Sequence, residues 1–240
     1  MEKIIGLNQF LDDYPLMSRV VCLGSGIRLR GEFNFKAVGD DCEEVEDTYM
    51  LEIVIPDQFP RDIPTVKEIG GKIPREDSFH VNGDGSLCLG SPIRLMKKIY
   101  DAPNLTGFIN GCLVPYLYAV SSKLKNGGGF LFGQLSHGNQ GISEDYSDIF
   151  GLQNNKQTMQ AIQLLCNRKR IANKKRCPCG CGKKLGACQL HNKLNMYRKM
   201  APTSWFSKSH YIANKREKKI QHRQKIDSGA RQGNIGQQKP

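Results

Sequence analysis

One cysteine of this chain, Cys88, directly follows a run of turn-forming residues. The segment reads His80-Val81-Asn82-Gly83-Asp84-Gly85-Ser86-Leu87-Cys88, and its glycines and aspartate predict a tight, exposed turn. A cysteine is most often a small buried side chain. Placed after a turn, with a histidine and an amide side chain upstream, Cys88 is instead a candidate nucleophile, because a thiolate must be reachable to react.

This stretch resembles the ubiquitin-conjugating enzymes. Their hallmark is an aromatic-Pro-x-x-x-Pro turn, then His-Pro-Asn, then a glycine-containing turn into Cys-Leu. The matching residues here are Phe59-Pro60 with Pro64, His80-Val81-Asn82, and Gly85-Ser86-Leu87-Cys88-Leu89. Val81 replaces the middle proline, and the turn before the cysteine is shorter, as in the shortened bacterial relatives. Residues 132–138 also look like a segment of those relatives, so the resemblance covers roughly residues 1–152.

The resemblance implies that Cys88 receives a ubiquitin-like protein from its activating enzyme as a thioester and passes it to an amine. Asn82 matches the residue that stabilises the oxyanion or braces the loop. His80 matches the motif histidine, whose role is mainly structural. His137 is either a base near the thioester or an exposed loop histidine. Kinship further implies a bacterial ubiquitin-like conjugation system used in anti-phage defence.

Two alternatives for Cys88 stay open at this point. A Cys–His hydrolase could pair Cys88 with His80 or His137, since such dyads are set by the fold and not by spacing. An inactive relative would only bind a ubiquitin-like protein. The retention of both Cys88 and Asn82 and the order of the preceding segments favour transfer.

A second group of cysteines reads Cys177-Pro178-Cys179-Gly180-Cys181, followed by Cys188-Gln189-Leu190-His191. Clustered cysteines in a non-secreted chain favour a metal site over disulfides. The segment resembles the SEC-C motif, a zinc-binding module found at the C-terminus of a bacterial secretion ATPase. That resemblance makes Cys177, Cys179 and Cys188 ligands of a structural zinc. Its fourth position falls on Gln189, a poor ligand, so His191 or Cys181 is expected to substitute.

The charge of the chain is divided unevenly along its length. Residues 1–155 contain 14 Lys/Arg and 21 Asp/Glu, a net of −7, whereas residues 156–240 contain 21 Lys/Arg and 2 Asp/Glu, a net of +19. Such a basic region typically meets a polyanion, although a solubilising tail is also possible. The competing function class is therefore a non-catalytic adaptor that binds nucleic acid, the ribosome or an acidic protein. Trp205, Phe206 and Tyr211 are candidates for stacking on bases.

The pattern of apolar residues predicts an α+β fold in the order of the ubiquitin-conjugating fold: a helix, an antiparallel meander, a long loop and further helices. Expected helices cover 7–21, 105–124 with a kink at Pro115, 143–152 capped by Ser143, and 154–172. Expected strands cover 27–35, 48–55 and 65–69. The remaining cysteines are expected to pack as small apolar side chains; they are Cys22, Cys42, Cys112 and Cys166.

Four regions are expected along the chain: a conjugating-like domain (1–152), a basic helical connector (153–175), a zinc module (176–200) and a basic, disordered tail (201–240). No stretch approaches 18 consecutive apolar residues, and the N-terminus lacks the pattern of a signal peptide. We therefore expect a cytoplasmic protein without a membrane partner.

Overall fold

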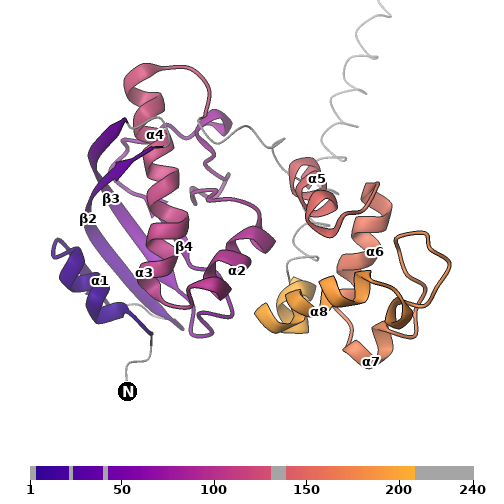
Figure 1. Ribbon diagram of the computed structural model, residues 1–240. Helices are drawn as coiled ribbons and strands as arrows, with labels where there is room; N and C mark the ends of the chain where they lie inside the picture. The colour runs from indigo at the N-terminus through magenta and orange to yellow at the C-terminus, as the bar shows by residue number, and fades with distance from the viewer. Residues whose placement is uncertain (1–3, 22–23, 40–42, 131–138, 209–240) are drawn as a thin grey trace, which may run out of the picture. The chain divides into compact units, whose positions relative to one another are not determined.

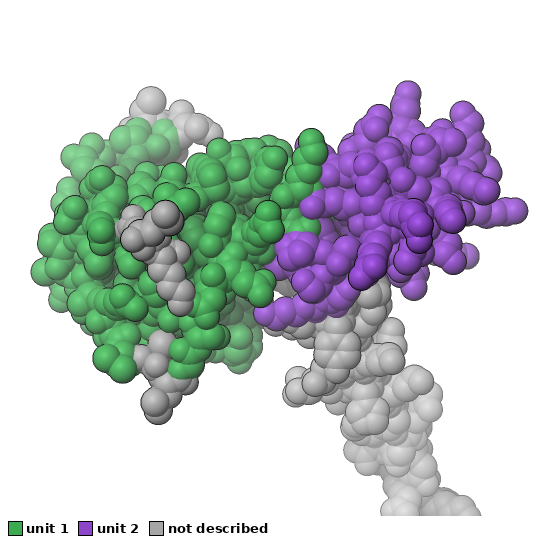
Figure 2. All heavy atoms as spheres, turned by 90° about the horizontal axis from the view of Figure 1, so that it is seen from below, with its two compact units in different colours: residues 1–137, 199–201 green, residues 138–198, 202–240 purple. Residues whose placement is uncertain are grey.

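The computed structural model describes residues 4–21, 24–39, 43–130 and 139–208, with the backbone alone at 139–140. The chain divides into two compact units, residues 1–137 with 199–201 and residues 138–198 with 202–240 (Figure 2). The division falls before the expected boundary at 152. The expected connector and all of the expected zinc module except residues 199–200 lie in the second unit, along with the helix that precedes them.

The first unit is built on a four-stranded antiparallel sheet in the order β1-β2-β3-β4. The strands are β1 (Met17–Val20), β2 (Ile27–Val38), β3 (Glu44–Ile55) and β4 (Thr65–Glu68). Apolar and polar residues alternate along β2 and β3, so one face of the sheet is apolar. On β3 that face consists of Tyr49, Leu51, Ile53 and Ile55, all buried as the alternation predicts.

Helices α1 (Leu7–Asp13) and α4 (Val114–Asn126) contribute to the core under the sheet. Figure 1 shows α4 lying across the strands. The expected helix over 7–21 is wrong in its second half, because Met17 pairs with Gly31 of β2 and begins β1 instead. A side chain at Gly31 would lie 2.1 Å from the Leu16 carbonyl oxygen, so this close approach of the two strands requires glycine.

The long helix expected over 105–124 is broken into α3 (Leu105–Phe108), a π-helical turn (Ile109–Leu113) and α4. Pro115 has no backbone N–H to donate to the carbonyl of Gly111, one turn earlier. Lys98 of α2 (Pro92–Asp101) donates its Nζ to that carbonyl at 2.8 Å instead. A wider turn before the proline thus accommodates the ring.

The second unit contains α5 (Asn139–Phe150), α6 (Asn155–Leu165), α7 (Lys169–Ala172) and α8 (Leu190–Met200). The side chain of Asn154 caps α6 by accepting a hydrogen bond from the Gln157 N–H. Ser143 is not the N-cap expected of it, because α5 already begins at Asn139; its hydroxyl donates to Asn155 Oδ1 at 2.6 Å.

The end of α6 is fixed by a cation from α8. Arg198 donates from its guanidinium to the carbonyls of Leu164, in the last turn of α6, and of Asn167, just after the helix ends. The core of this unit includes five aromatic side chains, all buried: Tyr146, Phe150, Tyr197, Trp205 and Phe206. The sequence-based expectation that Trp205 and Phe206 stack on bases is therefore wrong, and Tyr211 lies outside the described residues. Within the described ranges, no helix has the length and apolar character needed to cross a membrane.

Candidate cysteine sites

Cys88 lies at the end of a small hairpin that runs from His80 to Cys88. The Cys88 backbone N–H donates to the His80 carbonyl at 2.8 Å, and Val81 pairs with Leu87 between them. The arm that carries Cys88 also joins the sheet, since the Leu87 N–H donates to the Val66 carbonyl of β4 at 2.8 Å. The predicted turn therefore holds its cysteine at a fixed position beside the edge of a sheet.

The turn of this hairpin, Asn82 to Ser86, is closed by hydrogen bonds between its own residues. The Asn82 N–H donates to the Ser86 carbonyl and the Asn82 side-chain amide donates to Ser86 Oγ at 3.0 Å. Asp84 Oδ1 accepts from the Ser86 backbone N–H at 3.0 Å and from its hydroxyl at 2.6 Å. Gly85 has a φ of 79°, a conformation that glycine adopts without strain. The amide of Asn82 thus braces the turn with one of its N–H groups.

The residues before the hairpin are anchored from α4. Tyr116 donates its hydroxyl to the Phe79 carbonyl at 2.8 Å, and Lys123 donates to the Ser78 carbonyl at 2.6 Å. Burial raises the pKa of the Tyr116 hydroxyl, and the charge of a Cys88 thiolate adds to this shift. Sequence reasoning treated Tyr116 only as part of an apolar helix face. The seven-residue spacing of Tyr116 and Lys123 on one face was the available signal that both reach the same loop.

His80 takes part in the hairpin mainly through its backbone and ring packing. It adopts the left-handed conformation, with φ 54° and ψ 46°, which is uncommon for a residue with a side chain. Its ring centroid lies 4.5 Å from that of Phe130. The His80 carbonyl also accepts the bond from the Cys88 N–H, so His80 is held in place at the start of the hairpin, and its expected structural role stays a prediction.

The thiol of Cys88 is partly exposed and makes no hydrogen bond to any side chain in the described part of the chain. A Cys–His dyad brings the two side chains within hydrogen-bond distance, although this distance can be longer before substrate binds. His80 does not make that contact, and His137 lies outside the described residues. Among the described residues, Cys88 is therefore a partly exposed cysteine without a bonded base.

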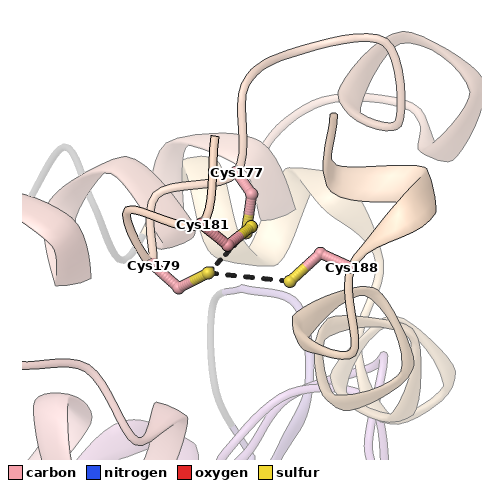
Figure 3. Close-up of side chains that lie close together, drawn as sticks. All are labelled: Cys177, Cys179, Cys181 and Cys188. Carbon is pink, nitrogen blue, oxygen red and sulfur yellow. Dashed lines mark hydrogen bonds between the residues drawn. The ribbon is translucent and has the colours of Figure 1, made fainter. Parts of the chain in front are cut away.

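The second cysteine group brings four sulfurs together. The ligand atoms of Cys177, Cys179, Cys181 and Cys188 all lie within 4.8 Å of one another. Figure 3 shows Cys179 between its two sulfur neighbours, at 3.2 Å from Cys177 and 3.6 Å from Cys188. A zinc–sulfur bond of about 2.3 Å implies sulfur–sulfur edges of about 3.8 Å in a tetrahedron. The four thiols thus have the spacing needed to hold a metal ion.

The backbone brings these thiols together with a short hairpin and two glycines. Arg176 pairs with Lys184, and the Cys177 N–H donates to the Lys183 carbonyl at 2.9 Å. Gly180 and Gly182 have φ values of 82° and 73°, which lets the chain reverse twice between Cys177 and Lys183. A 3₁₀ turn, Leu185–Ala187, then returns Cys188 to the first three cysteines. Leu185 is buried and is the main apolar anchor of this loop.

His191, the other candidate for the fourth position, lies outside this group of sulfurs. Its Nδ1 is 2.9 Å from Asn173 Oδ1, and its Nε2 is 2.7 Å from the Asn195 side-chain amide nitrogen. A neutral ring protonated on Nδ1 satisfies both contacts, because it donates to Asn173 and accepts from Asn195. Neither ring nitrogen is then left for a metal, and Cys181 takes the fourth place.

The thiols of the group differ in acidity. Burial raises the pKa of Cys177, whereas a hydrogen bond with the backbone of Lys183 and interaction with the Cys179 thiol lower the pKa of Cys181 to about 7. Four thiolates this close would repel one another without a cation. A divalent metal would deprotonate all four and remove that repulsion.

The cysteines expected to pack as apolar side chains fall into two sets. Cys112 is buried, and burial raises its pKa to about 11. Cys166 is partly buried, and burial raises its pKa as well. Cys22 and Cys42 lie outside the described residues. Cys88 is therefore the one cysteine of the first unit's described residues that is exposed enough to react.

No family model, curated protein or solved structure matches this chain.

Proposed function

We propose that this protein is a transferase that carries a ubiquitin-like protein on Cys88 as a thioester and passes it to an amine. The observation that carries the proposal is the partly exposed Cys88 thiol at the end of a hairpin fastened to a sheet edge. The order of elements in the first unit supports it. A helix, an antiparallel meander, the cysteine loop and then helices is the order expected of a ubiquitin-conjugating fold.

The chemistry consists of two acyl transfers. In the first, Cys88 Sγ loses its proton and attacks the carbonyl carbon of the modifier's C-terminus; a new carbon–sulfur bond forms as the activating enzyme's thiolate leaves. In the second, an amine attacks the same carbon, the carbon–nitrogen bond forms, the bond to Cys88 breaks, and the amine gives up a proton. No oxidant or reductant is involved.

The hairpin would support both steps by fixing the position of the thiol. The incoming acyl group must approach a sulfur whose place is set within a fraction of an ångström. Bonds to the Val66 and His80 carbonyls on one side, and the Asn82–Ser86–Asp84 turn on the other, restrict the movement of Cys88. We assign Asn82 to this restriction and His80 to the backbone frame. Both assignments favour positioning over proton transfer.

The cysteine group of the second unit is proposed to hold one structural zinc through Cys177, Cys179, Cys181 and Cys188. A site closed by four thiolates has no open position for substrate, so it stabilises the fold and takes no part in acyl transfer. Few apolar side chains lie in this loop, and the metal would therefore provide much of its folding free energy.

The test of the proposed activity is a charging assay with the full-length, zinc-loaded protein. Its cognate activating enzyme and ubiquitin-like protein, with ATP and magnesium, should shift the protein on a gel in a way that thiol reverses. Cys88→Ala should abolish the shift, whereas Cys112→Ala, a matched substitution at a buried cysteine, should keep it. A shift that survives Cys88→Ala would contradict the proposal.

A further inference from the structure

The second unit presents a dense group of exposed cations. From residue 149 to residue 216 the sequence contains no aspartate or glutamate. Eight lysines and arginines in this stretch lie on α7, next to it or on the cysteine hairpin that follows, and all are exposed. We call this group the basic face; it comprises Arg168, Lys169, Arg170, Lys174, Lys175, Arg176, Lys183 and Lys184.

The basic face is one continuous framework, because backbone hydrogen bonds join α7 and the residues after it to the cysteine hairpin. The Leu185 N–H donates to the Lys175 carbonyl at 2.9 Å, and the Gly186 N–H donates to the Asn173 carbonyl at 3.1 Å. Arg176 pairs with Lys184 across the hairpin. The cations are therefore held close together, and the cysteine cluster lies at the base of the same hairpin.

No ion pair within the described ranges involves any of these eight cations. Like charges gathered without counter-charges repel one another and create a positive surface potential. A polyanion removes that repulsion when it binds. The composition of the face thus favours an anionic partner over a cationic or neutral one.

A cleft of about 280 Å³ lies within the basic face, lined by Arg170, Ile171, Lys174 and Lys175. Arg170 lies on α7 and Lys174 lies in the turn that follows it, and both line the cleft. Ile171 is 46% exposed and gives the cleft one apolar wall. The cleft is large enough for a phosphodiester group between the guanidinium and the two ammonium groups.

The aromatic side chains of the second unit decide how a nucleic acid could be bound. Proteins that bind single strands stack bases on exposed aromatic rings. All five aromatic residues among the described residues of this unit are buried, which leaves the face with cations and no stacking surface. Recognition would therefore depend on the phosphate backbone, which a duplex presents at high charge density.

We propose that the basic face binds the phosphate backbone of a nucleic-acid duplex without reading its bases, and that the cleft between Arg170 and Lys175 takes one of the phosphates. This binding is separate from acyl transfer at Cys88 and does not depend on the proposed activity. The proposal assigns nucleic-acid contacts to the folded part of the second unit as well as to the basic C-terminal segment.

The test compares two full-length, zinc-loaded variants that each lose three positive charges. One is Arg170→Gln/Lys174→Gln/Lys175→Gln in the basic face; the other is Lys218→Gln/Lys219→Gln/Lys225→Gln near the C-terminus. Binding of a fluorescent 20-base-pair DNA duplex is measured by anisotropy between 50 and 300 mM salt. Each lost phosphate contact lowers the slope of log K against log salt by about 0.9. Because its three side chains surround one phosphate, we expect the first variant to lose about one unit of slope and about tenfold in affinity at 0.1 M salt, with a smaller loss in the second variant.

Three outcomes would overturn the proposal. They are an equal loss in both variants, tighter binding of a single strand of the same length than of the duplex, and binding of polyglutamate as tight as that of the duplex. Metal analysis will show whether the first variant keeps its zinc; if it does not, Arg170→Gln alone gives the same test, with an expected loss of affinity smaller than that of the triple variant. Cys88→Ala should bind the duplex like the unaltered protein. A failure of the duplex-binding proposal can therefore be distinguished from a failure of the acyl-transfer proposal.

Discussion

The two cysteine sites of this protein use the same side chain in opposite ways. Cys88 is a single thiol, partly exposed and without a hydrogen bond to any described side chain, and the loop that carries it is fixed by backbone and hydroxyl contacts. Cys177 and its three partners converge on one point, in a loop with Leu185 as its main buried apolar anchor. In the first site the fold positions the thiol, whereas in the second the thiols, through a metal, would position the fold.

This contrast shows which features of the surrounding loop make a cysteine reactive and which make it structural. A thiol is free for chemistry when hydrogen bonds and apolar packing already determine its loop, since it then has no role in folding. Thiols that must bind metal for their loop to fold are not free to react. The predictions below test this difference, beginning with the largest expected effect.

Loss of one ligand should release the metal from the second unit. Cys188→Ser is expected to lower the zinc content from one per chain to none and to make residues 174–195 sensitive to protease, because structural zinc provides about 10 kcal/mol or more of folding free energy. Cys166→Ser, at a partly buried cysteine outside the group, should keep the zinc. Cys181→Ser should lose it and His191→Ala should retain it; the reverse result would return His191 to the ligand set.

Alkylation should separate the two kinds of thiol within one sample. With zinc bound, iodoacetamide is expected to modify Cys88 while Cys112, whose pKa burial raises to about 11, and the four cluster cysteines stay unmodified. After chelation, the cluster cysteines should react as well. Peptide mass spectrometry with a time course measures both states. Rapid labelling of the cluster cysteines in the zinc-loaded protein would contradict the comparison.

Asn82→Ala should impair charging of Cys88 and discharge to an amine together, by about fivefold, because the net loss of a bracing hydrogen bond is about 1 kcal/mol. Ser86→Ala removes the other end of the same bond and should have a similar effect. Single-turnover assays of the two single variants and the double variant test this, and the double variant should be little worse than either. A loss of about 10²-fold in discharge alone would instead assign Asn82 to the oxyanion.

Tyr116→Phe should destabilise the first unit by about 1–2 kcal/mol, because the Phe79 carbonyl would lose its hydrogen bond in a buried place. Urea denaturation measures the change in the free energy of unfolding of the first unit. Tyr100→Phe is the matched control: Tyr100 is 45% exposed, and its substitution should change stability by less than about 0.5 kcal/mol. The zinc content should not change in either variant, which again separates the two sites.

The sequence predicted the strands of the first unit well, because alternation along Ile27–Val38 and Glu44–Ile55 depends only on which residues face the core. It failed where long-range contacts decide the local structure. Met17 to Val20 form a strand by pairing with β2, and Gly31 opposite Met17 permits the close approach of the two strands. Trp205 and Phe206 lie in a basic, polar stretch that resembles a disordered tail, yet both side chains are buried.

The candidate sites were predicted to a similar degree. The turn before Cys88 and the grouping of Cys177, Cys179 and Cys188 follow from local composition. The bond from Asn82 to Ser86 and the anchor from Tyr116 to Phe79 do not, since each depends on how side chains are directed after folding. The fourth cluster position was left open between Cys181 and His191, and two asparagine side chains that hold the His191 ring decide it in favour of Cys181.

The most direct test of the central claim is to trap and map the acyl group on Cys88. In Cys88→Ser, the hydroxyl should form an oxyester with the ubiquitin-like protein when the cognate activating enzyme, ATP and magnesium are supplied. That bond should resist thiol and yield to hydroxide, and peptide mass spectrometry should locate the modifier's C-terminal residue on position 88. An acyl group mapped to any other cysteine, or full charging of Cys88→Ala, would contradict the account.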